Sequence, residues 1–444
     1  MSWASEIYEV DRKAAEICRD MTITGIAFDR ERAGTLAASL LAIEQGVRAQ
    51  ADANAGRPIR RTKGGGFGMT GGDGLEAAFF QWLRAPVYFR SSLTRRPSLG
   101  IDALRGYAAC ADPRLSGLAL NVIDWRRARK LRRTYVEGVT IEDDGRVHPG
   151  WKNYGAVSGR WSCRKPNLMN LPRRSTDPTA GLGGIRSQYI AHLPGHEQDD
   201  CTFVIFDMKQ LEMRVAAYAS GDSAMIAACE SKDLHAANAK IIFGSAFEDA
   251  ASCPLKGSAS HVCERCDLYE KLRTCAKTSG FAVAYLAEAA TVFARLIADG
   301  LNVTLREVEQ MLRRMRREFH AYYEWQERRL YQCIKYGWVD EPVSGRRRWL
   351  GHAPEATACA NFPIQGGAAA IMNLRVPEVV SALRARRVTA RLVAQVHDSC
   401  AFECRKDDAP EVSDICRTAM QRAIRVGDRD AEFPIDLKVS SRLG

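Results

Sequence analysis

Two aspartates that lie far apart in the chain constrain its fold more than any other feature. Asp207 closes the apolar run TFVIFDM, and Asp398 follows the apolar run LVAQV in LVAQVHDSCAFE. Both runs have the length and composition of buried β-strands. One sheet can therefore bring the two carboxylates to the same edge, where oxygen ligands of this kind hold divalent cations for phosphoryl transfer. The pair indicates nucleotide chemistry.

The composition fits a large protein with a polyanionic partner. A chain of 444 residues with 46% hydrophobic content can bury a core in two or three lobes. Its net charge of +11 suits DNA or RNA. No leader or membrane-spanning run is visible, which predicts a cytoplasmic protein. Without a secretory leader, the 14 cysteines favour reduced thiols or a metal site over disulfides.

The first 75 residues contain a helical pattern and a glycine-rich stretch. Apolar spacing predicts helix over 7–50. The basic, glycine-rich segment 57–74 places Gly66, Gly68 and Gly71 in dinucleotide-fingerprint spacing. A fingerprint needs an apolar strand before it, whereas RRTK precedes this one. The segment therefore favours a flexible loop.

Two further helical stretches stand out. Residues 113–136 are predicted to be helical and end in a basic tract at 126–133. A charge run is usually a solvated helix face, but one sign throughout favours phosphate contact. Thr304 and Glu307 fit a capping box at the start of a long amphipathic helix that continues through 308–330, which we interpret as scaffold.

Four residues of KLRTCAKTSGFAVAYLAEA are spaced by four: Arg273, Lys277, Phe281 and Tyr285. On a helix they share one broad face, with the cations toward the N-terminal end. The cations could meet a triphosphate while the rings pack against a base. Taken alone, such a stripe is more often part of a core, with cations that extend to the surface.

These segments, in this order, resemble the polymerase domain of the family A DNA polymerases from near residue 5 to near the C-terminus. The first motif is FDMKQLEMRVAAYASGD. The resemblance implies that Asp207 and the backbone carbonyl of Met208 bind metal, that Gln210 lies at the nucleotide site, and that Glu212 is the steric gate against a ribose 2′-hydroxyl.

The second motif resembles the fingers helix of this family. It implies that Arg273 and Lys277 bind the incoming triphosphate, that Phe281 stacks near the sugar and base, and that Tyr285 guards the templating position. His235, in KDLHAANAK, matches a histidine that touches the triphosphate. A lone histidine on a helix is more often structural.

The third motif, LVAQVHDSCAFE, resembles the catalytic hairpin of the family. His397 is then expected near the primer terminus, with Asp398 as the second metal ligand. In NFPIQGGAAAIMN, Asn361 and Gln365 are expected to contact template-primer. The resemblance also assigns DNA contacts to Arg160, Asn167 and Asn170 in GRWSCRKPNLMN and to Arg129, Lys130 and Arg133 in the basic tract.

The resemblance implies an α+β right-hand fold with an antiparallel-sheet palm and mainly helical thumb and fingers. Expected parts are thumb and palm entry (1–150), palm with the first aspartate (151–225), fingers (226–345) and palm with the second aspartate (346–444). The implied activity is template-directed addition of dNTPs to a primer with two Mg²⁺ ions, on primer-template DNA. A phage-like enzyme without a proofreading domain is expected, with a separate nuclease or processivity factor as partner.

The chain departs from the family pattern at four positions. Ala282 and Leu286 replace glycines in the fingers helix, which puts the packing behind the nucleotide in doubt. Ser399 stands where many relatives have a glutamate, so the two aspartates remain the main metal ligands. Thr357 replaces an arginine expected before NFPIQGG, which removes one template-primer contact.

Two other functions stay open at this point. A single-subunit RNA polymerase shares the palm and favours serine after His-Asp, but Glu212 argues against it. An inactive DNA-binding homologue is the second alternative, although both aspartates and the triphosphate cations are present. Primer extension with dNTPs or rNTPs separates these functions.

A cysteine-rich segment, SCPLKGSASHVCERCDLYEK, is longer than the family usually has there. Cys253, His261, Cys263 and Cys266 form a candidate structural zinc site, because the last two have zinc-knuckle spacing and an insertion without a core benefits from a metal. The segment lacks a second Cys-x-x-Cys pair, so reduced thiols remain the alternative.

Overall fold

The computed structural model describes residues 3–91, 95–172, 176–256, 261, 263–284, 288–298, 301 and 303–444, without the side chains of 3–7, 278–284 and 298. Two compact units form. Unit 1 comprises Met1–Thr24, Trp151–Cys163 and Phe203–Val439, and unit 2 comprises Gly25–Gly150, Arg164–Thr202 and Ser440–Gly444. The chain thus crosses between units several times, and the first helix belongs with the second half of the sequence.

Unit 1 contains the four-stranded sheet on which the two aspartates lie. Its strand order is β13 (Ile435–Ser440), β6 (Cys201–Met208), β10 (Ser399–Arg405), β9 (Ala390–Val396). β9 and β10 form an antiparallel hairpin with Ser399 opposite Val396. Phe203, Val204 and Phe206 are buried, as expected for an interior strand. The two predicted strands are confirmed.

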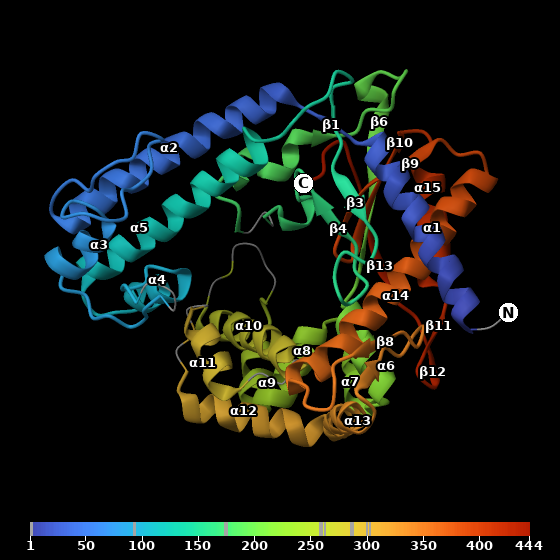
Figure 1. Ribbon diagram of the computed structural model, residues 1–444. Helices are drawn as coiled ribbons and strands as arrows, with labels where there is room; N and C mark the ends of the chain where they lie inside the picture. The colour runs from blue at the N-terminus through green and yellow to red at the C-terminus, as the bar shows by residue number, and fades with distance from the viewer. Residues whose placement is uncertain are drawn as a thin grey trace. The chain divides into compact units, whose positions relative to one another are not determined.

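Helices make up most of the rest of unit 1. They are α1 (Trp3–Thr24), α6 (Leu211–Ser220), α7 (Ser223–Glu230), α8 (Leu234–Phe243), α9 (Ser245–Ala251), α10 (Glu264–Ala284), α11 (Ala289–Ala298), α12 (Leu305–Glu318), α13 (His320–Tyr336), α14 (Ala356–Ala385) and α15 (Ala409–Gln421). Helices α7 to α13 share one hydrophobic core, which includes Leu234, Val308 and Tyr322. Figure 1 shows α8 to α12 gathered in one cluster.

Short strands complete unit 1. They are β3 (Gly150–Lys152) with β4 (Ser162–Arg164), β7 (Trp338–Asp340) with β8 (Arg347–Trp349), and β11 (Ile424–Val426) with β12 (Arg429–Ala431). The glycine pair of α14 permits close packing: a Cβ at Gly366 would lie 2.9 Å from Glu341 Cβ, and one at Gly367 would lie 2.8 Å from Val215 Cγ1. Both distances are too short for a side chain, so glycine lets α14 approach its neighbours.

Unit 2 is built around two long helices. Asn54 donates to Asn121 at 2.8 Å, and Arg132 Nε donates to Glu44 at 2.7 Å. Residue numbers therefore fall along one helix as they rise along the other, which makes the pair antiparallel (Figure 1). The two long helices are α2 (Arg30–Ala55) and α5 (Pro113–Lys130), which continues as η2 (Leu131–Val136). The other elements of unit 2 are β1 (Ile26–Phe28), α3 (Leu75–Ala77), η1 (Ala78–Trp82), α4 (Ile101–Ala108), β2 (Arg146–Val147), η3 (Leu168–Asn170), η5 (Ala180–Leu182), η6 (Ile185–Gln188), β5 (Tyr189–Ile190) and η7 (Gln198–Asp200).

Two predicted helices are interrupted. The helix expected over 7–50 ends at Thr24, because Gly25 adopts a φ of +63°. Strand β1 follows from Ile26, and Asp29 then caps α2. The amphipathic helix expected through 330 ends at Glu318, and α13 begins at His320. The capping box of Thr304 and Glu307 is confirmed. The helix predicted over 113–136 is also confirmed, its last six residues forming a π-helical turn.

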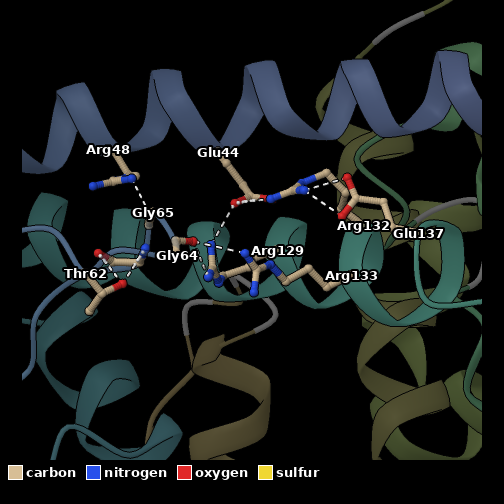
Figure 2. A network of polar contacts seen from close by, with 10 residues as sticks. Glu44, Arg48, Thr62, Gly64, Gly65, Arg129, Arg132, Arg133 and Glu137 are labelled. Carbon is tan, nitrogen blue, oxygen red and sulfur yellow. Dashed lines mark hydrogen bonds and ion pairs between the residues drawn. The ribbon is translucent and has the colours of Figure 1, made fainter.

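The glycine-rich segment 57–74 is a loop, as predicted, and turn hydrogen bonds and one isolated β-bridge hold it together. Arg61 pairs with Phe67 as an isolated β-bridge, and the Thr62 hydroxyl accepts a hydrogen bond from Gly66 N–H at 2.9 Å. Phe67 is buried against Trp125 of α5 with ring centroids 4.8 Å apart. The aromatic contact and the turn hydrogen bonds hold the glycines in place, as Figure 2 shows for Thr62, Gly64 and Gly65.

In the part of the chain that is described, no helix has both the length and the apolar character that a bilayer span requires.

Candidate active site

The structure brings the two predicted metal ligands together at one edge of the sheet. Asp207 lies next to the end of β6, and Asp398 lies in the turn between β9 and β10. The backbone N–H of Met208 donates to the Asp398 carbonyl oxygen at 3.0 Å. Burial, with a further contribution from the Asp207 and Asp398 charges, holds the pKa of the Cys400 thiol well above its usual value. The hydrogen bond between Met208 and Asp398 places both aspartates at the same end of the adjacent strands β6 and β10.

The hairpin turn gives Asp398 its place. His397 has a φ of +57°, the left-handed conformation that tight two-residue turns require. Gln395 is buried and donates from Nε2 to the His397 carbonyl at 3.3 Å. Arg160, Gln395, His397 and Asp398 line one small pocket. The sequence did not predict the role of Gln395. A polar residue within a strand is common, and nothing in the pattern indicates that its side chain bonds to the backbone of the turn.

Arg160 links the two halves of the site. Its guanidinium forms an ion pair with Glu212, and its Nη2 lies 3.9 Å from Asp398 Oδ1. The next residue, Trp161, is buried and donates to Asn373 at 2.6 Å, which fixes the backbone beside Arg160. The ion pair was not predicted: the resemblance gave Arg160 and Glu212 separate roles, and they are 52 positions apart.

The segment between β6 and α6 orients the first motif. Gln210 adopts a φ of +54° and directs the chain into α6, so Glu212 stands in the first turn of that helix. Lys209 N–H donates to the Pro434 carbonyl at 2.9 Å, and the Lys209 ammonium lies 2.7 Å from Asp436. These contacts place the Glu212 carboxylate at a helix N-terminus, where negative charge is favourable.

The predicted triphosphate residues gather between α8 and α10. Arg273 donates from Nε and Nη2 to Asp233 at 2.8 and 3.3 Å, and Asp233 also accepts from the His235 N–H. Burial, followed by the charges of Lys277 and Arg273, lowers the pKa of His235. Burial opposes ionisation of Asp233, but Arg273 and the helix N–H groups outweigh it and lower the pKa of that carboxyl. Sequence reasoning missed Asp233, whose signal was its N-cap position in KDLH.

The two aromatic residues expected on this helix give no side-chain observation. Phe281 lies within α10, but its side chain is outside the described residues, and Tyr285 is outside them entirely. Lys277 is exposed. The spacing by four therefore holds for the helix backbone from Arg273 to Phe281, while the roles of the rings stay predictions.

Asn361 and Gln365 both lie on α14, one turn apart, and are half-buried. Asn361 Oδ1 is buried without a hydrogen-bond partner among the described residues. A buried carbonyl oxygen without a partner is uncommon and suits a ligand contact. Thr357 lies on the same helix, one turn before Asn361.

The remaining predicted DNA contacts belong to unit 2. Asn167 caps η3 by accepting from Met169 N–H at 3.1 Å, and Asn170 contributes a hydrogen bond to Tyr135. In the basic tract, Arg129 and Arg133 both donate to the Gly64 carbonyl, at 2.7 and 3.0 Å (Figure 2). These asparagines and arginines are thus partly engaged by their own unit.

Two carboxylates pair with the arginine at the centre of the tract. Arg132 donates to Glu44 at 2.7 and 3.2 Å and to Glu137 at 2.6 and 2.7 Å (Figure 2). Arg129 Nη1 lies 3.5 Å from the same Glu44. Lys130 is exposed.

The structure also brings the candidate zinc ligands together. They are Cys253, His261, Cys263 and Cys266, and all their ligand atoms lie within 4.8 Å of one another.

A family model described as DNA polymerase family A matches residues 49–444. The chain belongs to DNA polymerase family A. Its relatives include DNA polymerase I of Chloroflexus aurantiacus, 28% identical over 437 residues that cover 94% of this chain and 41% of the relative. Thermostable DNA polymerase I of Thermus aquaticus is 27% identical over 428 residues, which cover 93% of this chain and 45% of the relative. This family A chain therefore spans less than half the length of these relatives.

A solved structure described as the POL domain of Pol1 from M. smegmatis, in complex with DNA primer-template and dNTP, is similar to the family A chain. The TM-score is 0.76 at 23% identity, covering 97% of this chain and 69% of that one. The likeness confirms the α+β right-hand polymerase fold that the motifs predicted.

Proposed function

We propose that this chain is a template-directed DNA polymerase that adds nucleotides from dNTPs to the 3′ end of a primer. One observation carries the proposal: the hydrogen bond from Met208 N–H to the Asp398 carbonyl, which keeps the two aspartates of a family A chain at one sheet edge. The names of its relatives, DNA polymerase I, and the primer-template and dNTP of the similar structure support it.

The donor chemistry at this edge fits Mg²⁺. Two carboxylates, Asp207 and Asp398, and the backbone carbonyl of Met208 are hard oxygen ligands, which Mg²⁺ prefers. When bound, two such ions lower the pKa of the primer hydroxyl and stabilise charge on the phosphates. The exposed position of Asp207 leaves room for a nucleotide beside it.

Arg273, Lys277 and His235 are proposed to bind the triphosphate. The bidentate contact with Asp233 fixes the Arg273 guanidinium and leaves part of its donor set for phosphate oxygens. Burial and the nearby cations lower the pKa of His235, so its ring is neutral near pH 7 before a nucleotide binds, and one ring N–H can donate to a phosphate oxygen. Each such group is worth about 3 kcal/mol in transition-state stabilisation.

Glu212 is proposed as the steric gate, with Gln210 beside it at the nucleotide site. The ion pair with Arg160 holds the Glu212 carboxylate in one orientation, so the space for a 2′-hydroxyl stays filled. A guanidinium has five N–H donors, so Arg160 can also donate to the DNA minor groove. Arg160 then acts on both primer-template and sugar selection.

Primer-template contacts are proposed from both units. Asn361 contributes its unpartnered Oδ1, and Gln365 lies on the same helix one turn on. His397 occupies the hairpin turn beside Asp398. From unit 2 the proposal includes Asn167, Asn170, Arg129, Lys130 and Arg133.

Primer extension with the full chain tests the proposal and its alternatives. A labelled primer on a longer template is incubated with Mg²⁺ and either dNTPs or rNTPs. Extension with dNTPs and strong rejection of rNTPs is expected. Extension with rNTPs alone would establish an RNA polymerase, and DNA binding without extension under any condition would establish an inactive homologue.

A further inference from the structure

We infer that Cys253, His261, Cys263 and Cys266 bind one structural Zn²⁺ ion. The four side chains come from the segment between α9 and α10 and from the first turn of α10. Their ligand atoms, three sulfurs and one ring nitrogen, all lie within 4.8 Å of one another. Three partly buried thiols and one imidazole converge here on a single point, as they would around a common ligand.

The individual distances match a tetrahedral metal site. Cys253 Sγ lies 3.8 Å from Cys263 Sγ and 3.3 Å from His261 Nε2. Zn–S bonds of about 2.3 Å and Zn–N bonds of about 2.0 Å at tetrahedral angles place two sulfurs about 3.8 Å apart and a sulfur and a nitrogen about 3.5 Å apart. A disulfide would need sulfurs about 2.0 Å apart, so the Cys253 and Cys263 sulfurs are not bonded.

The donor set identifies the metal and its role. Three thiolates and one imidazole favour zinc over magnesium or calcium, which take oxygen ligands. Four protein ligands fill a tetrahedral shell and leave no position for water or substrate, which is typical of structural zinc. The site is therefore distinct in chemistry from the carboxylate edge formed by Asp207 and Asp398.

The surrounding segment has little else to hold it. Among its described residues, none between α9 and α10 belongs to the hydrophobic core, and Leu255 is 56% exposed. Lys256 of this segment lies 4.1 Å over the ring of Tyr269, which stacks on Phe247 with ring centroids 5.0 Å apart. A metal supplies the fixed points that so few apolar contacts cannot.

Zinc at this place would fix the start of α10. Cys266 and Arg273 are seven residues apart, which puts them on the same helix face within about 20° and about 10 Å apart along the axis. The ion would therefore anchor the helix that carries Arg273 and Lys277. Metal binding itself does not depend on polymerase activity, so it is measured separately.

Metal analysis of the full chain tests the zinc site. Protein purified without chelator from zinc-supplemented cells is expected to contain about one Zn²⁺ per chain by plasma mass spectrometry. The double variant C263S/C266S is expected to retain less than about a tenth of that, because two thiolates are lost. The matched control is Cys110→Ser, since Cys110 is a partly exposed free cysteine of unit 2.

Cobalt substitution of the wild-type chain covers the case in which the double variant does not fold. Intense thiolate-to-Co²⁺ absorption near the ultraviolet edge, with tetrahedral d–d bands, is expected and should disappear on addition of Zn²⁺. Zinc-free wild-type protein with no thiolate-to-Co²⁺ absorption would overturn the inference. A native Cys253–Cys263 disulfide found by peptide mass spectrometry would overturn it as well.

Discussion

The basic tract of unit 2 and the carboxylate edge of unit 1 are both dense groups of charge, but the fold treats them differently. In the tract, Arg132 is held by two carboxylates, and Arg129 and Arg133 donate to the Gly64 carbonyl. At the sheet edge, Asp207 is exposed at a strand end, and the hairpin turn presents Asp398. Charge surrounded by internal acceptors stabilises the fold, whereas charge presented at an edge suits ligand chemistry.

The comparison also shows why the same type of sequence signal has two meanings. A run of like charges and a pair of aspartates each predict a ligand, phosphate in one case and metal in the other. Only the residues that contact each charged group in the folded chain show whether that group is structural or free to bind a ligand. Four variants, from the largest expected effect to the smallest, test whether the carboxylates of the sheet edge are functional and whether Arg132, at the centre of the tract, is structural.

Asp398→Asn is expected to have the largest effect. The amide keeps the size of the side chain but removes the charge that Mg²⁺ needs, so the rate of primer extension should fall by roughly 10³-fold or more. DNA affinity should change only a few-fold, because a phosphate-binding surface is not removed. Single-turnover extension and fluorescence anisotropy measure the two quantities.

Asp430→Asn is the matched control for Asp398→Asn. Asp430 is an exposed carboxylate of β12 whose partner is Arg425, at 3.4 Å. Its loss should leave the extension rate unchanged. Equal extension rates for Asp398→Asn and the control would show that the carboxylates of the sheet edge take no part in the reaction.

Glu44→Gln tests the structural side. Glu44 is buried and accepts two hydrogen bonds from Arg132, which is itself 10% exposed. Breaking a buried ion pair costs about 3 kcal/mol, so amides of α2 and α5 should exchange with solvent roughly 10²-fold faster. Hydrogen-exchange mass spectrometry of residues 30–55 and 113–136 measures this.

The control for that variant is Glu137→Gln. Glu137 contacts the same guanidinium but its side chain is 46% exposed, so its loss should cost no more than about 1 kcal/mol. Similar exchange rates in the Glu44 and Glu137 variants would show that the buried pair has no special part in holding the two helices.

Glu212→Ala sharpens the account of the sheet edge. Removing the carboxylate opens the space beside the sugar, so discrimination against rNTPs should relax by on the order of 10- to 100-fold while dNTP extension persists. Steady-state incorporation of a single dNTP or rNTP gives the ratio. If rNTPs are rejected as strongly as before, the gate assignment is wrong.

Much of the sheet edge was predictable because its signal is local. The apolar runs before Asp207 and Asp398 indicated strands, and the resemblance to family A placed both in one palm. The contact between Arg160 and Glu212 was not predictable, because neither residue's neighbourhood encodes the other. The contact between Asp233 and Arg273 was not predictable either, because these residues are 40 positions apart and belong to different helices.

In the fold, local periodicity failed where a single backbone position decided the outcome. Gly25 ends a helix that apolar spacing alone would continue, and Phe319 separates two helices with one continuous amphipathic pattern. The glycine-rich segment 57–74 has the composition of a flexible loop, yet Phe67 anchors it on Trp125. Tertiary partners of this kind leave no trace in composition or spacing.

Lys130→Ala is expected to have the smallest effect, and it tests whether any part of the basic tract serves DNA. Lys130 is exposed, whereas the neighbouring Arg126 is half-buried and donates to the Leu99 carbonyl at 2.7 Å. Loss of one phosphate contact should weaken DNA binding a few-fold and reduce the slope of log K against log salt by about one. Arg126→Ala should instead destabilise unit 2 and leave the slope unchanged, because the guanidinium is half-buried and already donates to the Leu99 carbonyl. Anisotropy titrations over a range of salt concentrations compare the two variants, and an unchanged slope for Lys130→Ala would remove Lys130 from the proposed DNA contacts.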